Sequence, residues 1–303
     1  MTGVRLRLPA TSANLGPGFD TLALALQLYL EIEAEAATAF SIEAVGRNAD
    51  LCGALEDNLL LTTYEALLRA QGRTTVPLRI RMRNEIPLGM GCGSSAAVRL
   101  AAVALASHFG ELGWSRERIL AEACRLEGHP DNAAACWLGG FVASAQDGDG
   151  VQAVSLRLPA EWRAVIVMPD RPLATTASRA VLPESYARKD VVANLQRVAL
   201  LAVAFATGRA ELVANAMRDR LHQPYRAEVC PLLPKLLPLA GQDGILGVAL
   251  SGAGPAVLLL TESEAAARAA GERAEEAVRG LGAVEILVCA TEGGAAACEP
   301  GMG

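Results

Sequence analysis

Aromatic residues and histidines are scarce in this sequence. Its 303 residues include 5 Phe, 4 Tyr, 3 Trp and 3 His, although 52% of the chain is hydrophobic. The core must therefore be built mostly from Ala, Leu and Val, and a chain of this length fits one large domain or two packed subdomains. The sequence also has no run of about 18 uninterrupted apolar residues, so no membrane span is expected.

Further absences exclude several classes of protein. The 27 basic and 33 acidic residues are interspersed and give a formal charge of −6, so a basic stripe for nucleic acid is missing. The seven cysteines form no CxxC pair, and their odd number in a large chain favours reduced thiols. The N-terminal residues do not have the pattern of a signal peptide. We therefore expect a cytoplasmic protein with no nucleic-acid or membrane partner.

The most informative stretch runs from Pro87 to Ala97 and reads PLGMGCGSSAA. Three glycines alternate with other residues, two serines follow, and the apolar run to His108 predicts a helix. A glycine loop that opens a helix aims unpaired backbone N–H groups at one point, where the helix dipole favours negative charge. The pattern predicts a phosphate-binding loop, but a glycine-rich turn before a core helix explains it about equally well.

Two familiar phosphate-binding loops are excluded by single residues. A Walker A loop ends in Gly-Lys-Ser or Gly-Lys-Thr, and no lysine lies in this stretch. A dinucleotide-binding fingerprint needs a third glycine where Ser94 stands. The loop thus indicates a ligand with phosphates without naming it.

Periodicity along the chain predicts an α+β protein in which strands and helices do not alternate strictly. In the first half, strands are expected at 4–8, 22–33 and 78–82 and after the turn at 139–143, and helices at 58–71, 96–108, 116–126 and 131–137. In the second half, strands are expected at 162–168, 245–250, 256–260 and 284–290, and helices at 191–207, 211–221 and 264–280. The polar, glycine-containing run 146–150 predicts a boundary, which gives domains at 1–150 and 151–303.

A polar, glycine-broken segment follows the first predicted strand, from Pro9 to Asp20. Asn14 can donate and accept hydrogen bonds, whereas an ionised Asp20 only accepts, which suits an ammonium group. A structural turn capped by Asx side chains explains this segment better when it is taken alone. The segment 251–256, between two apolar runs, is also open: it predicts either a plain hairpin or a backbone surface that closes against a ligand.

Four polar groups fall on one sharp corner between Glu127 and Asn132, because Pro130 ends the preceding helix at or before His129. A lone carboxylate near phosphates is a typical magnesium ligand, since Mg²⁺ prefers oxygen and keeps several waters. His129 is either a functional group or a helix C-cap, and its place in a polar corner favours a functional role.

Taken together, these segments resemble the motifs of the GHMP kinase superfamily and, within it, those of the homoserine kinases. Segments 9–20, 87–97 and 247–256 are similar to its three ordered motifs, of which the second is the ATP phosphate loop. The corner 127–132, followed by three alanines, is similar to an acidic-Gly-His-Pro-Asp-Asn segment of the homoserine kinases. The resemblance covers nearly the whole chain.

The resemblance implies both a fold and a reaction. The fold would be the two-domain α+β GHMP kinase fold, with a ribosomal-protein-S5-like N-terminal domain and a ferredoxin-like C-terminal domain around an ATP-binding cleft. The reaction would be ATP-dependent phosphorylation of the L-homoserine side-chain hydroxyl to O-phospho-L-homoserine, in threonine biosynthesis. Mg²⁺ would be a cofactor, and the protein would be a homodimer.

The resemblance also assigns roles to single residues. The ATP site would comprise Asn58, at the adenine, together with Pro87, Leu88, Gly89, Met90, Gly91, Cys92, Gly93, Ser94, Ser95, Ala96 and Ala97. The metal would be held by Ser95, or Ser94 beside it, and Glu127. The homoserine pocket would be lined by Asn14, Asp20, His129, Asn132, Arg179 and Arg226. The catalytic residues would be Asn132, Thr175 and Arg179. Met90 and Cys92, at variable positions of the loop, would contribute backbone N–H groups.

These residue types suit the implied reaction. A guanidinium is planar and always charged, so Arg179 and Arg226 suit an amino-acid carboxylate, while Asp20 would balance the ammonium. Phosphoryl transfer depends mainly on positioning and charge neutralisation, so a strong general base is not required. Asn132 and the metal would orient the hydroxyl, and its proton would leave to a phosphate oxygen.

Two alternatives stay open. One is another GHMP kinase that acts on a different small alcohol, such as mevalonate or shikimate; the paired arginines and the polar corner argue against it. The other is a non-catalytic ligand-binding protein on the same fold; the presence of Glu127 and of the loop serines argues against it.

Overall fold

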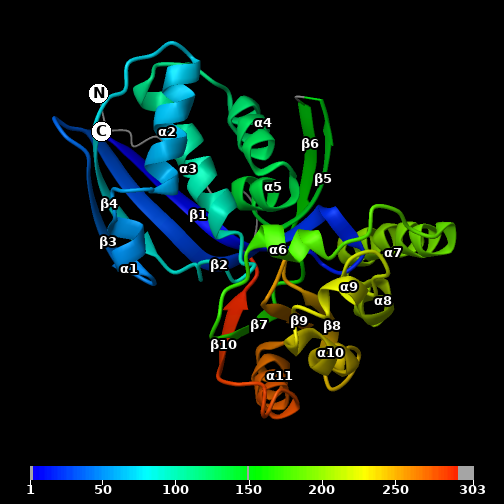
Figure 1. Ribbon diagram of the computed structural model, residues 1–303. Helices are drawn as coiled ribbons and strands as arrows, with labels where there is room; N and C mark the ends of the chain where they lie inside the picture. The colour runs from blue at the N-terminus through cyan, green and yellow to red at the C-terminus, as the bar shows by residue number, and fades with distance from the viewer. Residues whose placement is uncertain (1–2, 149, 293–303) are drawn as a thin grey trace.

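The computed structural model describes residues 3–148 and 150–292, which form two β-sheets with helices around them (Figure 1). The first sheet has the strand order β3-β4-β2-β5-β6, and β1 pairs with β2 beside this path. Its strands are β1 (Val4–Asn14), β2 (Gly18–Ala36), β3 (Ser41–Gly46), β4 (Leu78–Asn84), β5 (Phe141–Asp147) and β6 (Gly150–Leu156). All these pairings are antiparallel except β3–β4, which is parallel.

The first sheet has one covered face and one polar face. The helices beside it are α1 (Ala49–Gly53), α2 (Leu59–Ala70), α3 (Ser94–Phe109), α4 (Arg116–Glu127) and α5 (Asp131–Leu138). Figure 1 shows α2, α3, α4 and α5 together over one face. The other face carries exposed ion pairs such as Arg5–Glu33 and Arg81–Glu43. Exposed pairs contribute little to stability, so burial under the helices is what holds this half together.

The second sheet is antiparallel throughout, with the strand order β10-β7-β9-β8. Its strands are β7 (Arg163–Pro169), β8 (Ile245–Leu250), β9 (Val257–Thr261) and β10 (Val284–Ala290). The helices of this half are α6 (Thr175–Ala180), α7 (Arg188–Thr207), α8 (Ala210–Ala216), α9 (Gln223–Arg226), α10 (Leu232–Leu236), the 3₁₀ helix η1 (Leu237–Leu239) and α11 (Glu264–Ala277). These two sheets with their helices confirm the predicted α+β architecture, and the domain boundary at residue 150 stays a prediction.

The helix predicted at 211–221 is wrong, because α8 already ends at Ala216 and α9 begins at Gln223. Asp219 explains the interruption: its carboxylate accepts hydrogen bonds from the backbone N–H groups of Leu221, His222 and Gln223. Such side-chain bonds to the backbone compete with helix formation. The turn that results brings Arg226 to the cavity described below.

Two strands of the first sheet were not predicted from the sequence. β3 and β6 lie at its two edges and are mostly exposed or half-buried. An edge strand without a fully buried face has weak apolar alternation, which is the signal that identifies strands in a sequence.

Candidate active site

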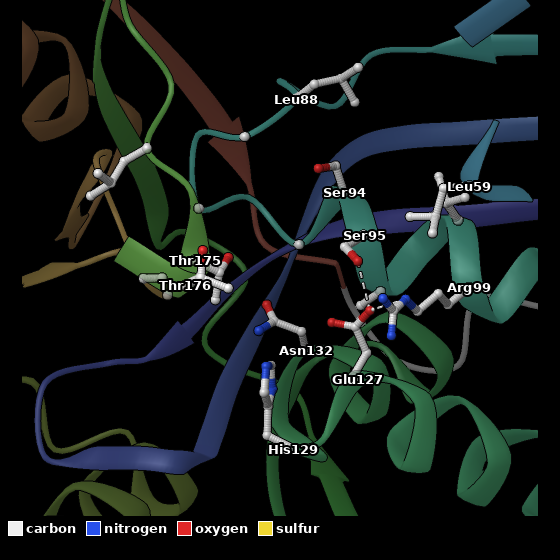
Figure 2. A pocket seen from close by; sticks show the side chains of 18 of the residues that line it. Leu59, Leu88, Ser94, Ser95, Arg99, Glu127, His129, Asn132, Thr175 and Thr176 are labelled. Carbon is white, nitrogen blue, oxygen red and sulfur yellow. Dashed lines mark hydrogen bonds and ion pairs between the residues drawn. The ribbon is translucent and has the colours of Figure 1, made fainter. Parts of the chain in front are cut away.

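A cavity of about 840 Å³ lies where the three glycine-containing segments meet (Figure 2). The backbone N–H of Thr11 donates to Cys92 O at 3.0 Å, which joins the end of β1 to the loop before α3. Ser251 Oγ donates to Gly91 O at 2.8 Å, which joins the turn between β8 and β9 to the same loop. Segments that are far apart in the sequence therefore form one wall.

Most of the predicted site residues line this cavity. They are Asn14, Asp20, Asn58, Leu88, Gly89, Gly91, Gly93, Ser94, Ser95, Ala96, Glu127, His129, Asn132, Thr175, Arg179 and Arg226. The loop residues outside the lining are Pro87, Met90, Cys92 and Ala97. The Cys92 thiol is buried in the core, where burial raises its pKa to about 12, so it is not a nucleophile at neutral pH.

The loop before α3 requires glycine at two positions. Gly93 has φ +71°, and a Cβ there would lie 1.9 Å from Thr11 Oγ1. Gly91 has φ +80°, and a Cβ there would lie 2.2 Å from Ser251 O. α3 then begins at Ser94 without a side-chain cap. Its first N–H groups are therefore left for a ligand, and the helix dipole favours an anion there.

Asn58 has a structural role as the N-cap of α2. Its Oδ1 accepts from Leu60 N at 3.0 Å, and its Nδ2 donates to Ala54 O at 2.7 Å. Its amide is thus already used by backbone groups, and the predicted adenine contact of Asn58 stays a prediction. Leu51 and Leu59 line the same part of the cavity and offer the apolar surface that a purine base needs.

A hydroxyl and a carboxylate meet beside the first turn of α3. Ser95 Oγ donates to Glu127 Oε1 at 2.8 Å, and Arg99 Nε lies 3.1 Å from the same oxygen (Figure 2). Mg²⁺ prefers oxygen ligands of this kind, so Ser95 and Glu127 fit a magnesium site next to the phosphate loop. The structure pairs Ser95, rather than Ser94, with the carboxylate.

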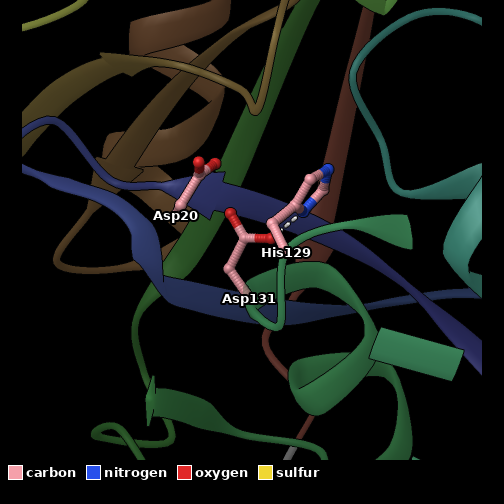
Figure 3. Close-up of side chains that lie close together, drawn as sticks. All are labelled: Asp20, His129 and Asp131. Carbon is pink, nitrogen blue, oxygen red and sulfur yellow. Dashed lines mark hydrogen bonds and ion pairs between the residues drawn. The ribbon is translucent and has the colours of Figure 1, made fainter. Parts of the chain in front are cut away.

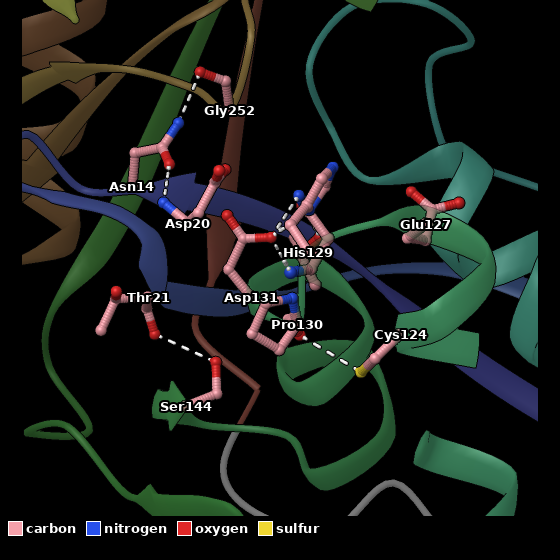
Figure 4. A network of polar contacts seen from close by, with 12 residues as sticks. Asn14, Asp20, Thr21, Cys124, Glu127, His129, Pro130, Asp131, Ser144 and Gly252 are labelled. Carbon is pink, nitrogen blue, oxygen red and sulfur yellow. Dashed lines mark hydrogen bonds and ion pairs between the residues drawn. The ribbon is translucent and has the colours of Figure 1, made fainter. Parts of the chain in front are cut away.

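The polar corner after α4 is organised by Asp131. This buried carboxylate lies 2.6 Å from His129 Nδ1 and accepts from the backbone N–H of Asn132 at 2.7 Å (Figure 4). Asn132 Oδ1 accepts in turn from Thr11 Oγ1 at 2.7 Å. Burial would lower the pKa of His129, but the hydrogen bond and charge of Asp131, with the charge of Asp20, outweigh burial and raise it. Figure 3 shows Asp20, His129 and Asp131 clustered at this corner.

The part of the cavity that is lined by Asp20, Arg179 and Arg226 carries opposite charges. Asp20 and Arg179 form a two-bond ion pair, with Nη2–Oδ1 at 2.6 Å and Nη1–Oδ2 at 3.1 Å. Asn14 holds Asp20 in place, because its Oδ1 accepts from Asp20 N and its Nδ2 donates to Gly252 O (Figure 4). Arg226 lies nearby and is 1% exposed. A ligand with both an ammonium and a carboxylate could exchange partners with such a pair.

Comparisons with known proteins agree with this geometry. Family models for the GHMP kinases N-terminal domain and the GHMP kinases C-terminal domain match residues 58–140 and 201–280. Homoserine kinase of Solibacter usitatus is 50% identical over 258 residues, which is 85% of this chain and 84% of that protein. The chain belongs to the homoserine kinases of the GHMP kinase family. Homoserine kinase of Moorella thermoacetica is 41% identical over 255 residues, 84% of this chain and 86% of that protein. The crystal structure of homoserine kinase from Cytophaga hutchinsonii has a TM-score of 0.81 at 26% identity, covering 97% of this chain and 96% of that one.

The sequence analysis assigned no role to three polar residues of this homoserine kinase family member: Thr11, Arg99 and Asp131. Arg99 lies one helical turn after Ser95, and that spacing from a predicted metal ligand was an available signal. Thr11 and Asp131 lie inside motifs that were recognised. Thr11 and Asn132, which share a hydrogen bond, are 121 positions apart, and the hydrogen bond between Asp131 and Asn132 depends on the local geometry of the turn. The sequence therefore carried no direct signal for either bond.

Proposed function

We propose that this protein transfers the γ-phosphate of ATP to the side-chain hydroxyl of L-homoserine, giving ADP and O-phospho-L-homoserine in threonine biosynthesis. One observation carries the proposal: a single cavity joins an uncapped helix N-terminus behind a glycine loop to a set of opposite charges, the half-buried Asp20–Arg179 pair and the buried Arg226. The first feature suits a triphosphate, and the second suits a zwitterionic amino acid.

The part of the cavity at the loop 87–97 is called the phosphate side. It would bind ATP mainly through backbone N–H groups of this loop. Ser95 and Glu127 would hold Mg²⁺, as their contact at 2.8 Å supports. When bound, the metal supplies positive charge that neutralises the phosphate oxygens. Arg99 would add a further positive charge at the edge of this site, through its ion pair with Glu127.

The part of the cavity at Asp20, Arg179 and Arg226 is called the amino-acid side. It would bind L-homoserine and hold the hydroxyl that is phosphorylated. Arg179 and Arg226 would take the carboxylate of L-homoserine, and Asp20 would take its ammonium. Asn132 would orient the hydroxyl, since Thr11 and Asp131 hold its amide in one position. No strong base is needed, because phosphoryl transfer is mostly positioning and charge neutralisation. Thr175, at the first residue of α6, would lie near the transferred phosphate.

A substrate panel tests the proposal against its alternatives. ADP release is measured by a coupled assay with L-homoserine, mevalonate, shikimate and galactose, each at saturating Mg²⁺ and ATP. Turnover with L-homoserine, confirmed by a phosphate-ester signal in ³¹P NMR, is the expected result. Turnover only with mevalonate or shikimate would assign a different GHMP kinase activity. Turnover with none of the four would favour a non-catalytic ligand-binding protein.

We also propose that the protein is a homodimer and that α7 forms the contact. Among the described residues, α7 is the one helix long and apolar enough to cross a membrane, yet only 22% of its apolar window is buried. Its exposed side carries Val192, Leu195 and Val203. Leu195 and Val203 lie symmetrically about Ala199, four residues before it and four after it, so two antiparallel copies of α7 could cover each other around a two-fold axis. The inner side of the helix is anchored, since Asn194 donates to Pro17 O and to Asp219.

Sedimentation equilibrium tests the dimer and its surface. Wild-type protein should sediment as a dimer, and Leu195→Asp should sediment as a monomer. Val288→Asp, which changes an exposed apolar residue on β10, is the matched control and should stay dimeric. A dimer that survives Leu195→Asp would contradict the α7 contact. Binding of wild-type protein to phospholipid vesicles would identify a membrane as the occupant instead.

A further inference from the structure

Arg226 is buried without a carboxylate partner among the described residues. It is 1% exposed and lines the cavity. Its Nε donates to Ser178 O at 3.3 Å, and its Nη1 donates to Gly252 O at 3.2 Å. Neutral carbonyls do not balance a buried cation, so this arrangement is costly until an anion arrives. Under the proposed function, that anion is the carboxylate of L-homoserine.

His222 completes the contacts of this guanidinium. Its Nδ1 lies 3.2 Å from Arg226 Nη1, and its Nε2 lies 2.7 Å from Gly16 O. A carbonyl only accepts hydrogen bonds, so Nε2 carries the proton, and Nδ1 offers a lone pair to the guanidinium. A second proton on the imidazole would remove that acceptor and place two cations side by side. Burial lowers the pKa of His222 and outweighs the nearby Asp219 carboxylate, which keeps the ring neutral.

Other groups hold the imidazole in one orientation. Asp219 accepts from the backbone N–H groups of His222 and Gln223, which fixes the turn that leads into α9. The Phe19 ring stacks on the imidazole with 5.2 Å between ring centroids. The same ring faces the Arg226 guanidinium, whose Cζ lies 5.3 Å from the Phe19 centroid. His222 is fully buried between these neighbours.

We propose that His222 is a positioning residue for the substrate carboxylate and acts through Arg226. By accepting from Nη1, the imidazole fixes the plane of the guanidinium. The N–H groups of Nη2, which bond no described residue, are then left for a ligand in the cavity. This inference rests on the proposed function, because it concerns how Arg226 binds the carboxylate of L-homoserine.

A matched pair of variants separates this role from a purely structural one. Asparagine at position 222 keeps an acceptor near the place of Nδ1, whereas glutamine reaches toward Gly16 and leaves Arg226 without its acceptor. We expect His222→Gln to raise KM for L-homoserine about tenfold, the size expected for one hydrogen bond to a charged group. KM for ATP and kcat should change by less than about twofold. His222→Asn should stay close to wild type in all three constants.

Two competitive inhibitors report on the carboxylate directly. L-2-aminobutyrate has the carboxylate but lacks the hydroxyl, and 3-aminopropan-1-ol has the hydroxyl but lacks the carboxylate. In His222→Gln, the inhibition constant of the first should rise about tenfold, and that of the second should not change. A parallel rise for both inhibitors, or equal KM for L-homoserine in the two variants, would overturn the proposal.

Thermal unfolding of each variant checks that it is folded.

Phe19→Leu gives a second test that leaves the hydrogen bonds in place but removes the ring on which the His222 imidazole and the Arg226 guanidinium stack. It should produce a smaller rise in KM for L-homoserine, with KM for ATP unchanged, and a rise in KM for ATP alone would contradict the proposal. Wild-type protein that does not phosphorylate L-homoserine at all would refute the proposed function rather than the role of His222.

Discussion

The phosphate side and the amino-acid side of the cavity are built by different means. The phosphate side is mainly backbone: a glycine loop and the uncapped first turn of α3. The amino-acid side is made of charged side chains, Asp20, Arg179 and Arg226, which come from three distant segments. A backbone site tolerates changed side chains but not the loss of a glycine, whereas a side-chain site fails when one charge is removed. Loss of a side chain on the amino-acid side should therefore weaken L-homoserine alone, whereas loss of a loop glycine should disturb the use of both substrates.

The largest effect is expected from Gly93→Ala, which changes the backbone of the phosphate side. The new Cβ would lie 1.9 Å from Thr11 Oγ1 and 3.2 Å from Asn132 Oδ1, so the loop must move away from the polar corner 127–132. A displacement of about 1 Å near a reacting group can cost about 100-fold in rate. We expect kcat/KM to fall by about that factor for both substrates, measured by steady-state kinetics.

Gly113→Ala is the matched control for this variant. Gly113 also has positive φ, +63°, but nothing lies within 4 Å of the Cβ that would be added. It should lose about 1 kcal/mol of stability from backbone strain and keep full activity. If the two alanine variants lose activity equally, the close approach of the loop to Thr11 is not what matters.

The next largest effect is expected from Arg226→Met on the amino-acid side. KM for L-homoserine should rise by about 10- to 100-fold, because one charge-assisted bond to the carboxylate is lost, while KM for ATP stays unchanged. The melting temperature should not fall, since methionine of similar volume replaces an unpaired buried cation. Equal weakening of both substrates would show that Arg226 supports the whole cavity instead of the carboxylate.

How much of this site the sequence could predict differs between the two sides. The phosphate loop is one continuous stretch with glycine spacing that has a direct physical meaning, so the sequence pattern of 87–97 identifies it without the fold. The charges of the amino-acid side are 159 positions apart in the case of Asp20 and Arg179. Their pairing depends on tertiary packing, so only the resemblance to a family brought them together, and the ion pair between them was not foreseen.

The fold shows the same division between local and tertiary signals. The α+β architecture and the positions of the four strands of the second sheet follow from apolar patterns that are readable along the chain. The break between α8 and α9 does not, because the Asp219 carboxylate stops the helix by accepting hydrogen bonds from the backbone N–H groups that follow it and from Asn194 on α7. Sequence periodicity across 211–221 favours one continuous helix, and only the tertiary position of that carboxylate overrides it.

A third, smaller effect is expected from acidification, which should affect the amino-acid side first. The groups that face His222 are Asp219 and Asp20, which raise its pKa, and Arg226, which lowers it; burial dominates, and the folded pKa lies below the ordinary value. The unfolded chain therefore binds the proton more readily. The free energy of unfolding should fall as pH drops below about 6.5, by at most about 1.4 kcal/mol per pH unit.

Urea unfolding between pH 5.5 and 7.5 measures this dependence, with His222→Asn as the control. His129 has a raised pKa and so contributes stability at low pH that is lost as pH rises through its folded pKa, which opposes the effect of His222. Both proteins contain His129, so its contribution cancels in the difference between their free energies of unfolding, and the contribution of His222 remains. A difference that does not grow steeper below about pH 6.5 would contradict a neutral His222.

The smallest effect is expected from Met90→Ala, in the middle of the phosphate loop. The Met90 side chain is not part of the cavity lining, and its carbonyl oxygen accepts from Ala256 N at 3.2 Å whatever the side chain is. KM for ATP should therefore stay within about twofold of wild type, because the side chain that is removed packs against the hydrophobic core and does not face the cavity. A tenfold rise in KM for ATP would mean that a loop side chain contributes to binding. The phosphate side would then depend on side chains in the same way as the amino-acid side.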